Sequence, residues 1–343
     1  MSELFNNILK SEESLFLNSQ LLDTDYQPKL IPFRENQQHH IATCIKPLLQ
    51  RRTGKNILIF GNPGVGKTVC LKHVLNELKE EYSDEVCCIY INCWKKDTPF
   101  KVIAEICEQL KYRWIHNKTF DDLMKSAAEI INEKSAVFVL DEIDKIQDQN
   151  IIYSLLEDIH RKCLILVTNE KELISKLDNR IRSRLLPDLL EFKSYSSPET
   201  ESILKQRIEY AFISNSLQKE AFDLIVSKTF ESGDLRMGLF LLKQAGENAE
   251  NKSSRAISIE HVQEALSSLN TKDLDNKVDP LLDIIKENPG KTTNELFKIY
   301  GQKENKSYRT FQRKIRELEK EDKIRIKEEN KGFNGRQTII EFT

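Results

Sequence analysis

The segment that starts at residue 61 combines residue types that can hold a triphosphate. It reads, in order, Gly61, Asn62, Pro63, Gly64, Val65, Gly66, Lys67, Thr68 and Val69. An apolar run precedes it and a helical pattern follows it, and a glycine-rich loop between strand and helix is a phosphate cradle. Backbone N–H groups can close around phosphates there because glycine has no Cβ. In this phosphate loop (residues 61–68) we expect Lys67 to bridge the β- and γ-phosphates, Thr68 to ligate Mg²⁺, and the helix N-terminus to face the anion.

Two adjacent carboxylates end a second apolar run. Asp141 and Glu142 directly follow the residues Val137–Leu140. A carboxylate at the end of a neighbouring strand can hold Mg²⁺ beside a bound triphosphate, and we expect that role for Asp141. Glu142 is then placed to polarise the attacking water as a general base. Acidic residues often end strands, so the informative feature is their position downstream of a phosphate loop.

Further polar residues follow the next apolar run and the helical region. Asn169 ends the run 163–168 and could orient water or contact the γ-phosphate. Arg180 and Arg184 lie in an arginine cluster that could reach the γ-phosphate of a neighbouring subunit as a finger. We favour Arg184 over Arg180 and leave both open. Arg236 follows a Gly-Asp-Leu sequence and could reach back to the nucleotide from a helix start.

The elements that must position these residues alternate between strands and helices. Helical patterns over about 68–82, 100–110 and 120–133 separate short apolar runs. This alternation predicts an α/β fold with a parallel sheet. The five runs expected to form its strands are Ile57–Phe60, Val86–Asn92, Ala136–Leu140, Cys163–Thr168 and Leu189–Phe192.

Strand signals stop near residue 195, and helical periodicity then continues to about residue 269 with a break near Gly233. The polar stretch after it indicates a linker, and Pro280 opens a third unit. We therefore divide the chain into a nucleotide-binding base at 1–195 (with an N-terminal segment at 1–35), a helical lid at 196–270, a linker at 271–279 and a C-terminal unit at 280–343.

Composition excludes several classes of protein. No run of about 18 uncharged apolar residues exists, which excludes a helical membrane span, and the first residues lack the pattern of a secretory signal. The seven cysteines show no Cys-x-x-Cys pair, so we expect neither zinc nor disulfides. We expect a cytoplasmic protein. Residues 277–343 hold 16 Lys/Arg and 12 Asp/Glu, a charge of +4 in a chain whose net charge is −2. Nucleic acid, if bound, should be bound chiefly there.

The C-terminal unit contains a helix pattern over about 306–322 with two opposed stripes. The apolar stripe is Tyr308, Phe311, Ile315 and Leu318, and the cationic stripe is Lys306, Arg309, Arg313, Arg316 and Lys320. At about 100° per residue the stripe centres lie roughly 160° apart. An ordered row of cations suits the phosphates beside a major groove, although a solvated helix with i, i+4 pairs is the simpler alternative.

Two shorter helices precede this one and two strand-like runs follow it. The sequence therefore predicts a winged helix, with Lys331 and Arg336 of the loop 330–336 at the minor groove or the DNA backbone. A winged helix that docks on protein is the alternative.

Taken in order, the phosphate loop, the Asp-Glu strand end, the strand-end asparagine, the arginine cluster and the Gly-Asp-x-Arg helix start resemble those of AAA+ ATPases. A narrower resemblance is to archaeal replication initiators, which are relatives of the origin recognition complex and of its helicase-loading partner. It covers about residues 13 to 343. The segments that carry it are Asp25–Glu35, Leu140–Ile146, Ile203–Arg207 with Ala211-Phe212, and 233–250.

This resemblance implies that Asn169 is the first sensor and Arg236 the second. It also implies that the segment from Tyr26 to Arg34 covers the adenine, with Tyr26, Pro28 and Ile31 as wall residues and Arg34 among the nucleotide-binding side chains. Two departures are visible. The family's small residues near the finger favour Arg180 as an alternative to Arg184, and the region 111–118 lacks the Pro and Gly of the family's DNA-touching insertion.

We therefore predict an AAA+ base with a helical lid and a C-terminal winged helix. The predicted function is an ATP-dependent replication initiator that binds double-stranded origin DNA in the nucleoid as an ATP/ADP switch, with slow hydrolysis. A replicative helicase and paralogous initiators are the expected protein partners. The alternatives are a clamp- or helicase-loading ATPase and a nucleotide-sensing transcription regulator.

Overall fold

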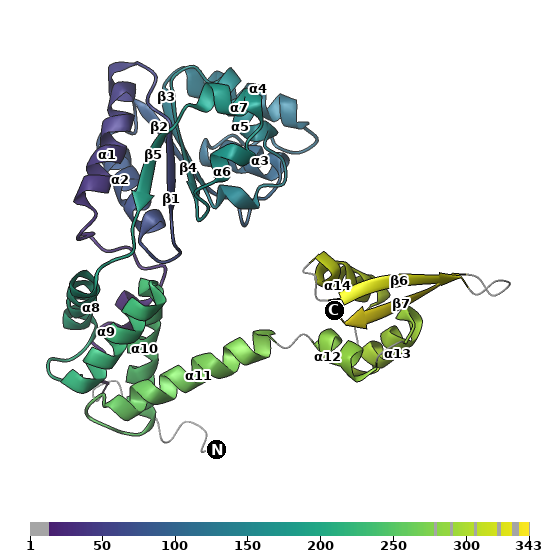
Figure 1. Cartoon of the computed structure of the whole chain (residues 1–343). Helices are drawn as coiled ribbons and strands as arrows, with labels where there is room; N and C mark the ends of the chain where they lie inside the picture. Colours follow the sequence, from purple (N-terminus) through teal and green to yellow (C-terminus); the bar gives the residue numbers. More distant parts are fainter. Residues whose placement is uncertain are drawn as a thin grey trace, which may run out of the picture. The chain divides into compact units, whose positions relative to one another are not determined.

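The computed structural model describes residues 14–277, 280–288, 291–304, 307–320, 324–330 and 336–342. Its contacts divide the chain into two compact units, Met1–Glu264 and Ala265–Thr343. Figure 1 shows the first unit as a sheet domain joined to a group of helices, and the second as helices with a small antiparallel sheet. Each unit is described by itself below.

A parallel sheet of five strands forms the centre of the first unit. Its strands are β1 (Ile57–Gly61), β2 (Val86–Asn92), β3 (Ser135–Asp141), β4 (Lys162–Thr168) and β5 (Asp188–Phe192). Their order is β2-β3-β4-β1-β5, and all four pairings are parallel. The five predicted strands and the parallel sheet are confirmed. Because parallel strands share one carboxyl edge, the ends of β1, β3 and β4 lie together there.

Helices cover both faces of this sheet (Figure 1). One face packs against α1 (Glu35–Ile45) and α2 (Lys67–Tyr82). The other face carries the remaining helices of the base, namely α3 (Pro99–Gln109), α4 (Phe120–Asn132), α5 (Asn150–Asp158), α6 (Leu173–Lys176) and α7 (Asn179–Leu185). The strands are almost fully buried, as expected of a parallel sheet covered on both sides. The result is a three-layer α/β sandwich.

The lid follows β5 and is entirely helical up to residue 264. It contains α8 (Ser197–Ala211), α9 (Lys219–Ser232) and α10 (Leu235–Asn251), and α11 (Ile259–Lys277) begins in it. The predicted break at Gly233 is present, because this glycine ends α9 in the left-handed conformation at φ 66°. A second break at 212–218 was not predicted.

Residues 14–34, termed here the N-terminal strap, connect the lid to the base. At one end Phe16 stacks on Phe212 with a ring separation of 4.8 Å, and Leu17 donates a backbone hydrogen bond to Ala211. At the other end Ile31 is buried in the core between the sheet and α1. The sequence division placed the whole segment 1–35 with the base, whereas residues 14–23 pack on lid helices. Residues 1–13 lie outside the described part of the chain.

The segment expected to be a linker is helical as far as Lys277. No glycine or proline interrupts it before Pro280, and its polar residues are compatible with a helix whether or not they pack. The predicted linker at 271–279 is therefore helical over 271–277, and its role as a linker stays a prediction. Residues 278 and 279 are not described.

After the part of α11 that lies in it, the second unit has the order helix, helix, helix, strand, strand. Its elements are α12 (Pro280–Glu287), α13 (Thr293–Glu304), α14 (Tyr308–Lys320), β6 (Ile324–Asn330) and β7 (Arg336–Phe342). The two strands pair antiparallel. This arrangement is consistent with the predicted winged helix. Residues 331–335, the tip of the predicted wing, lie outside the described ranges.

The apolar stripe of α14 packs inward with one exception. Phe311, Ile315 and Leu318 are at most 5 % exposed and join the core of the second unit. Tyr308 is 40 % exposed, because it stands at the start of the helix, where its ring meets the edge of Phe297 at 4.9 Å. Of the four residues in the apolar stripe, Tyr308 alone is therefore exposed.

No helix in the described part of the chain is long and apolar enough to cross a bilayer.

Candidate functional site

The phosphate loop joins β1 to α2 at the carboxyl edge of the sheet. Lys67 is 8 % exposed, and its ammonium group donates to the carbonyl oxygens of Gly61 at 2.7 Å and Asn62 at 2.9 Å. It also donates to Oδ1 of Asn169, at the end of β4, at 2.8 Å. The structure thus brings together Lys67 and Asn169, which are far apart in sequence. Burial lowers the pKa of Lys67, while the Asp141 carboxylate opposes that shift.

Thr68 and Asp141 meet directly. The Thr68 hydroxyl donates to Oδ2 of Asp141 at 2.7 Å, and the Tyr90 hydroxyl donates to the same oxygen at 2.6 Å. Asp141 is 2 % exposed at the end of β3. A hydroxyl oxygen and a carboxylate oxygen in contact are suitable ligands for Mg²⁺. The donor set therefore fits the metal expected from the sequence.

Glu142 adopts the left-handed conformation at φ 55°, which is uncommon for a residue with a Cβ. Such strain tends to occur at functional sites, where surrounding contacts maintain it. Here the Glu142 N–H donates to Oδ1 of Asp141 at 3.0 Å. Burial, followed by the nearby carboxylates of Asp141 and Asp144, raises the pKa of Glu142. A carboxylate with a raised pKa is a better proton acceptor.

Asp144 is a nearby carboxylate that the sequence analysis did not select. It accepts a hydrogen bond from the buried Thr168 hydroxyl at 3.0 Å, and Lys145 pairs with it at 2.7 Å. Thr168 lies at the end of β4 next to Asn169, so this contact holds the turn after Glu142 against the sheet edge. The sequence contained a signal for it, since three carboxylates occur within residues 141–144.

Arg34 lies beneath the phosphate loop and is 5 % exposed. Its Nη2 donates to the carbonyl oxygen of Val65 at 3.1 Å and to that of Lys193 at 2.6 Å. The guanidinium carbon lies 3.9 Å from the ring centre of Tyr195. All these partners belong to the chain itself. The position indicates that Arg34 supports the loop backbone, and its expected place among the nucleotide-binding side chains remains a proposal.

Tyr195 was missed by the sequence analysis because it lies in the connection after β5, outside any motif. Besides stacking on Arg34, its hydroxyl lies close to Gly66. A Cβ on Gly66 would be 2.9 Å from that oxygen, and the residue has φ +90°. Both facts require glycine at this position of the phosphate loop.

The lid contacts the loop at Gly64. The Leu235 N–H donates to the Gly64 carbonyl at 3.4 Å, and a Cβ on Gly64 would collide with Asp234, 1.7 Å from its Oδ1. Arg236 then forms an ion pair with Asp234, with 2.8 Å between Nη2 and Oδ2. Charge interactions also link Arg236 to Glu142 and Lys67. Arg236, the predicted second sensor, therefore lies beside the phosphate loop, where Asp234 of the lid holds it in an ion pair.

We expect Asp234→Asn to raise ATP affinity. Asparagine keeps the side-chain oxygen that accepts the Arg236 N–H at 2.9 Å, so the helix cap survives, but the charge that holds the guanidinium is lost. The gain should be at most about five-fold, because an exposed ion pair contributes only ~1 kcal/mol. Titration of the purified chain with a fluorescent ATP analogue measures it. Unchanged or weaker binding would show that Asp234 does not restrain Arg236.

The two candidate finger arginines lie on α7, away from the loop. Arg180 pairs with Asp178 at 3.2 Å, and Arg184 pairs with Glu157. Both guanidinium groups flank the Tyr153 ring, at 5.6 and 5.2 Å. Within residues 14–277, no hydrogen bond or ion pair joins either arginine to the phosphate loop. Both side chains are exposed, so a role toward a neighbouring subunit stays a prediction for each.

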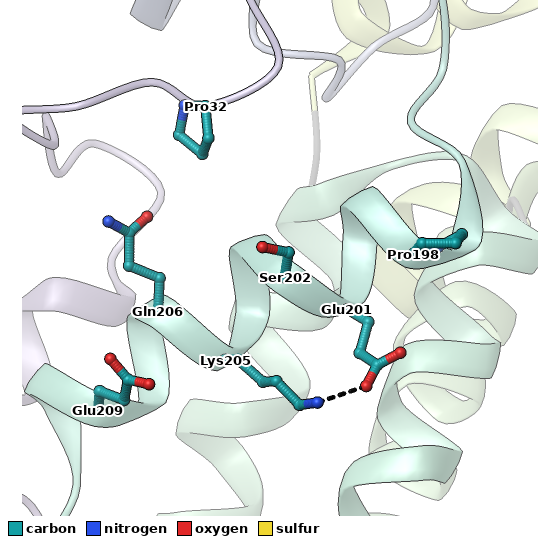
Figure 2. Close-up of a pocket in the computed structure, with 7 residues that line it drawn as sticks. All are labelled: Pro32, Pro198, Glu201, Ser202, Lys205, Gln206 and Glu209. Carbon is teal, nitrogen blue, oxygen red and sulfur yellow. Dashed lines mark hydrogen bonds and ion pairs between the residues drawn. The ribbon is translucent and has the colours of Figure 1, made fainter.

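The expected adenine-covering residues lie in the strap. Tyr26 is half-buried with its ring 5.0 Å from the Arg207 guanidinium of α8, Pro28 is half-buried, and Ile31 is only 8 % exposed because it packs into the core. A groove of about 600 Å³ lies between Pro32 and α8. Figure 2 shows Pro32 across from Ser202 and Gln206. None of the three expected wall residues lines this groove, whose charged residues are Glu201, Lys205 and Glu209 of α8.

The candidate DNA-binding residues lie on the second unit. Arg309, Arg313 and Arg316 are exposed on α14. The helix ends at Lys320 and β7 begins at Arg336, but the side chains of these two residues are not described. Lys306 and Lys331 lie outside the described ranges. The cationic row can therefore be followed over its three central arginines.

The region 111–118, which lacks the Pro and Gly of the family's DNA-touching insertion, is a loop after α3. Trp114 in this loop is 77 % exposed. The Lys118 ammonium donates to the Tyr112 hydroxyl and lies over the same ring. Lys118 thus has a partner within the chain, and the sequence departure and this contact give no support for DNA binding by the loop.

Comparison with known proteins identifies both parts of the first unit. Residues 50–177 match a family model described as an AAA domain. Residues 201–267 match a model described as the Cdc6 AAA+ ATPase-type lid domain. The nucleotide-binding base and the helical lid therefore each correspond to a known family.

Relatives and solved structures resemble most of the chain. An "ORC1-type DNA replication protein 1" of Sulfurisphaera tokodaii is 32% identical over 279 residues, which are 77% of this chain and 70% of that protein. An "ORC1-type DNA replication protein 2" of Methanosarcina mazei is 29% identical over 356 residues, covering 98% and 95%. The Aeropyrum pernix ORC1 protein in complex with DNA aligns with a TM-score of 0.75 at 23% identity, covering 97% of this chain and 94% of that one. Cdc6p from Pyrobaculum aerophilum aligns at 0.66 and 17%, covering 96% and 95%. These two structures establish a shared fold.

Proposed function

The chain belongs to the family of ORC1-type DNA replication proteins, and we propose that it is a replication initiator that binds origin DNA under the control of ATP and ADP. It is an AAA+ ATPase. Its relatives carry the name of DNA replication proteins, and one structural neighbour was solved with DNA. The observation that carries the proposal is a phosphate loop in contact with Asn169, Asp141 and the lid, in a chain that ends in a winged-helix-like unit.

Each residue around the loop has a role in this proposal. Lys67 exchanges its carbonyl partners for the β- and γ-phosphates, and Asn169 remains beside it to report on the γ-phosphate. Glu142 accepts a proton from the water that attacks the γ-phosphorus. The bond from that phosphorus to the bridging oxygen breaks, and ADP and phosphate result. Thr68 and Asp141 would hold Mg²⁺, which supplies positive charge to the phosphates.

The switch in this proposal is the lid. Arg236 sits on α10 with Asp234 as its partner and Gly64 as its neighbour. A γ-phosphate offers the guanidinium more negative charge than one carboxylate does, so ATP favours transfer of Arg236 to the nucleotide. Arg236 belongs to the lid and the phosphate loop belongs to the base. Transfer of Arg236 to the nucleotide therefore changes the position of the lid relative to the base.

The exposed arginines of α14 are proposed to bind DNA phosphates. We expect Arg309→Ala together with Arg316→Ala to weaken duplex binding and to reduce the slope of log affinity against log salt by about 0.9 for each lost phosphate contact. Fluorescence anisotropy at several salt concentrations measures both. Lys228→Ala on α9 is the matched control, since it removes an exposed cation from the other unit. Equal salt slopes for all three proteins would contradict a phosphate-binding α14.

Sequence specificity needs a separate experiment. Duplex from the replication origin of the source genome is compared with a shuffled duplex at one salt concentration, with ATP, with ADP and without nucleotide. We expect tighter binding to the origin and a difference between nucleotides. Equal affinities throughout would rule out an origin-specific switch. We further propose paralogous initiators and a replicative helicase as partners, which co-purification from the source cells tests.

A further inference from the structure

Three side chains of different chemistry converge on the side of the base that carries α1. His40 and Cys44 lie on α1, and Asp188 opens β5. The imidazole nitrogen, the thiol sulfur and a carboxylate oxygen of these residues all lie within 4.8 Å of one another. This cluster, termed here the α1–β5 cluster, has no part in the nucleotide site.

The backbone holds the members of the cluster in place. His40 and Cys44 are four residues apart on one helix, so their side chains share a face. The Asp188 N–H donates to the Asn56 carbonyl at 2.8 Å, and the Asn56 side chain bonds Leu185 and Leu164 at 2.7 and 2.9 Å. The Cys44 carbonyl accepts the Lys55 N–H at 3.0 Å. These contacts fix the backbone from which the three side chains reach one another.

The Cys44 thiol donates a long hydrogen bond to Oδ2 of Asp188 at 3.7 Å. Nε2 of His40 lies 3.8 Å from the same oxygen, whereas a good N–H···O bond spans about 2.9 Å. Nε2 of His40 is buried from solvent and makes no hydrogen bond within the described part of the chain. A tetrahedral ion with metal–ligand bonds of about 2.0–2.3 Å separates its ligands by roughly 3.5 Å. The two distances to Asp188 are close to that, and the His40–Cys44 distance is at most 4.8 Å.

We propose that His40, Cys44 and Asp188 bind one divalent transition-metal ion of the zinc class, with a solvent molecule as the fourth ligand. Imidazole, thiolate and carboxylate are the three ligand types of zinc sites. The side chains of His40 and Asp188 are 39% and 41% exposed, which leaves room for solvent, and Cys44 is buried. The ion joins α1 to β5.

Lys55 and the thiol proton compete with the metal. The Lys55 ammonium lies 4.0 Å from Oδ2 of Asp188, where it attracts that carboxylate and repels a cation. Cys44 is a thiol in the metal-free chain, because burial and the Asp188 carboxylate raise its pKa to about 11. The metal must displace that proton, as it does in other thiolate sites. Of these two effects that oppose metal binding, a substitution can remove only the positive charge of Lys55.

Sequence spacing could not reveal this site. The cysteines form no Cys-x-x-Cys pair, and the expectation from the sequence was that no zinc is bound. Cys44 and Asp188 are 144 positions apart, and only the pairing of β5 beside β1 brings Asp188 to α1.

The experiment titrates the full-length, chelator-treated chain with Co²⁺ in excess Mg²⁺, which keeps carboxylate sites occupied. We expect one equivalent to bind with a thiolate-to-cobalt charge-transfer band, and Zn²⁺ to displace it. Cys44→Ser should abolish the band. His40→Asn should weaken binding by more than the roughly 10- to 100-fold that loss of an outer-shell partner costs. His39→Asn, an exposed neighbour on the same helix, is the matched control and should bind like the parent.

Lys55→Gln keeps the proposal testable even where a loss-of-binding variant misfolds. We expect it to bind Zn²⁺ about five-fold more tightly, since one nearby positive charge is removed. Zn²⁺ should also raise the melting temperature of the parent and of His39→Asn, but not that of His40→Asn. Absence of the band in the parent, or equal affinities of the parent and His40→Asn, would overturn the proposal.

Discussion

Replacing Glu142 by glutamine is expected to lower ATP turnover by about 10²- to 10⁴-fold, the usual contribution of a general base. Glutamine has the same shape but cannot accept the proton of the attacking water. ATP binding should change little, because Lys67, Thr68 and Asp141 keep their mutual contacts. Phosphate release under single-turnover conditions gives the rate, and equilibrium titration gives the affinity.

Glu170→Gln is the matched control for this substitution. Glu170 is an exposed carboxylate just after the β4 end, and it pairs with Lys176 at the surface. Turnover should stay near that of the parent chain. A similar loss in both variants, or no loss in Glu142→Gln, would remove Glu142 from the role of base. The pH profile adds a second check, because a raised pKa at Glu142 predicts that turnover falls, as pH is lowered, earlier than for an ordinary glutamate.

Arg34→Met is expected to reduce both stability and nucleotide affinity. Methionine fills much of the same space but leaves the carbonyl groups of Val65 and Lys193 without their charged donor and Tyr195 without its stacked cation. We expect the free energy of unfolding to fall by about 2–4 kcal/mol. ATP affinity should also fall by about ten-fold or more. A ten-fold loss corresponds to only ~1.4 kcal/mol of binding free energy, which a shift of the loop backbone can cause.

Arg161→Met separates the two effects. Arg161 also donates to backbone carbonyls, those of Asn132 and Lys134 at 2.8 and 2.9 Å, but at the start of β4, the sheet edge opposite the phosphate loop. Denaturant unfolding should show a loss of stability in both variants, whereas ATP titration should show a loss of affinity only in Arg34→Met. Parent-like ATP affinity in a folded Arg34→Met protein would contradict a supporting role for Arg34.

The sequence predicted the parts of this site that depend on local pattern. Short apolar runs between helical patterns identified all five strands. Parallel strands share an edge, and this accounts for the meeting of Lys67, Asp141 and Asn169. The Gly-Asp-Leu-Arg helix start indicated Arg236, and family resemblance added its role as second sensor. These predictions were possible because each motif determines its local backbone conformation. Once the strand order is known, the positions of the strand ends follow.

The remaining features depend on pairs of residues that no local pattern connects. Arg34 is charged and follows a proline-containing segment, so nothing in its neighbourhood predicts burial under the loop. Tyr90 occupies an ordinary strand position, and its bond to Asp141 follows from the β2–β3 pairing. The metal proposal for His40 and Asp188 depends on strand order in the same way. Such contacts are set by tertiary packing.

The N-terminal strap has a mechanical consequence. The lid is held to the base at two places: covalently through the segment after β5, and noncovalently through the strap, whose first residues pack on lid helices. A body held at two points can rotate about the line that joins them, whereas a single tether would also allow it to swivel and tilt. Arg34, at the base end of the strap, donates to Lys193 at the start of the second connection. One side chain therefore links both connections beneath the phosphate loop, which restricts the ways in which the lid can rotate relative to the base.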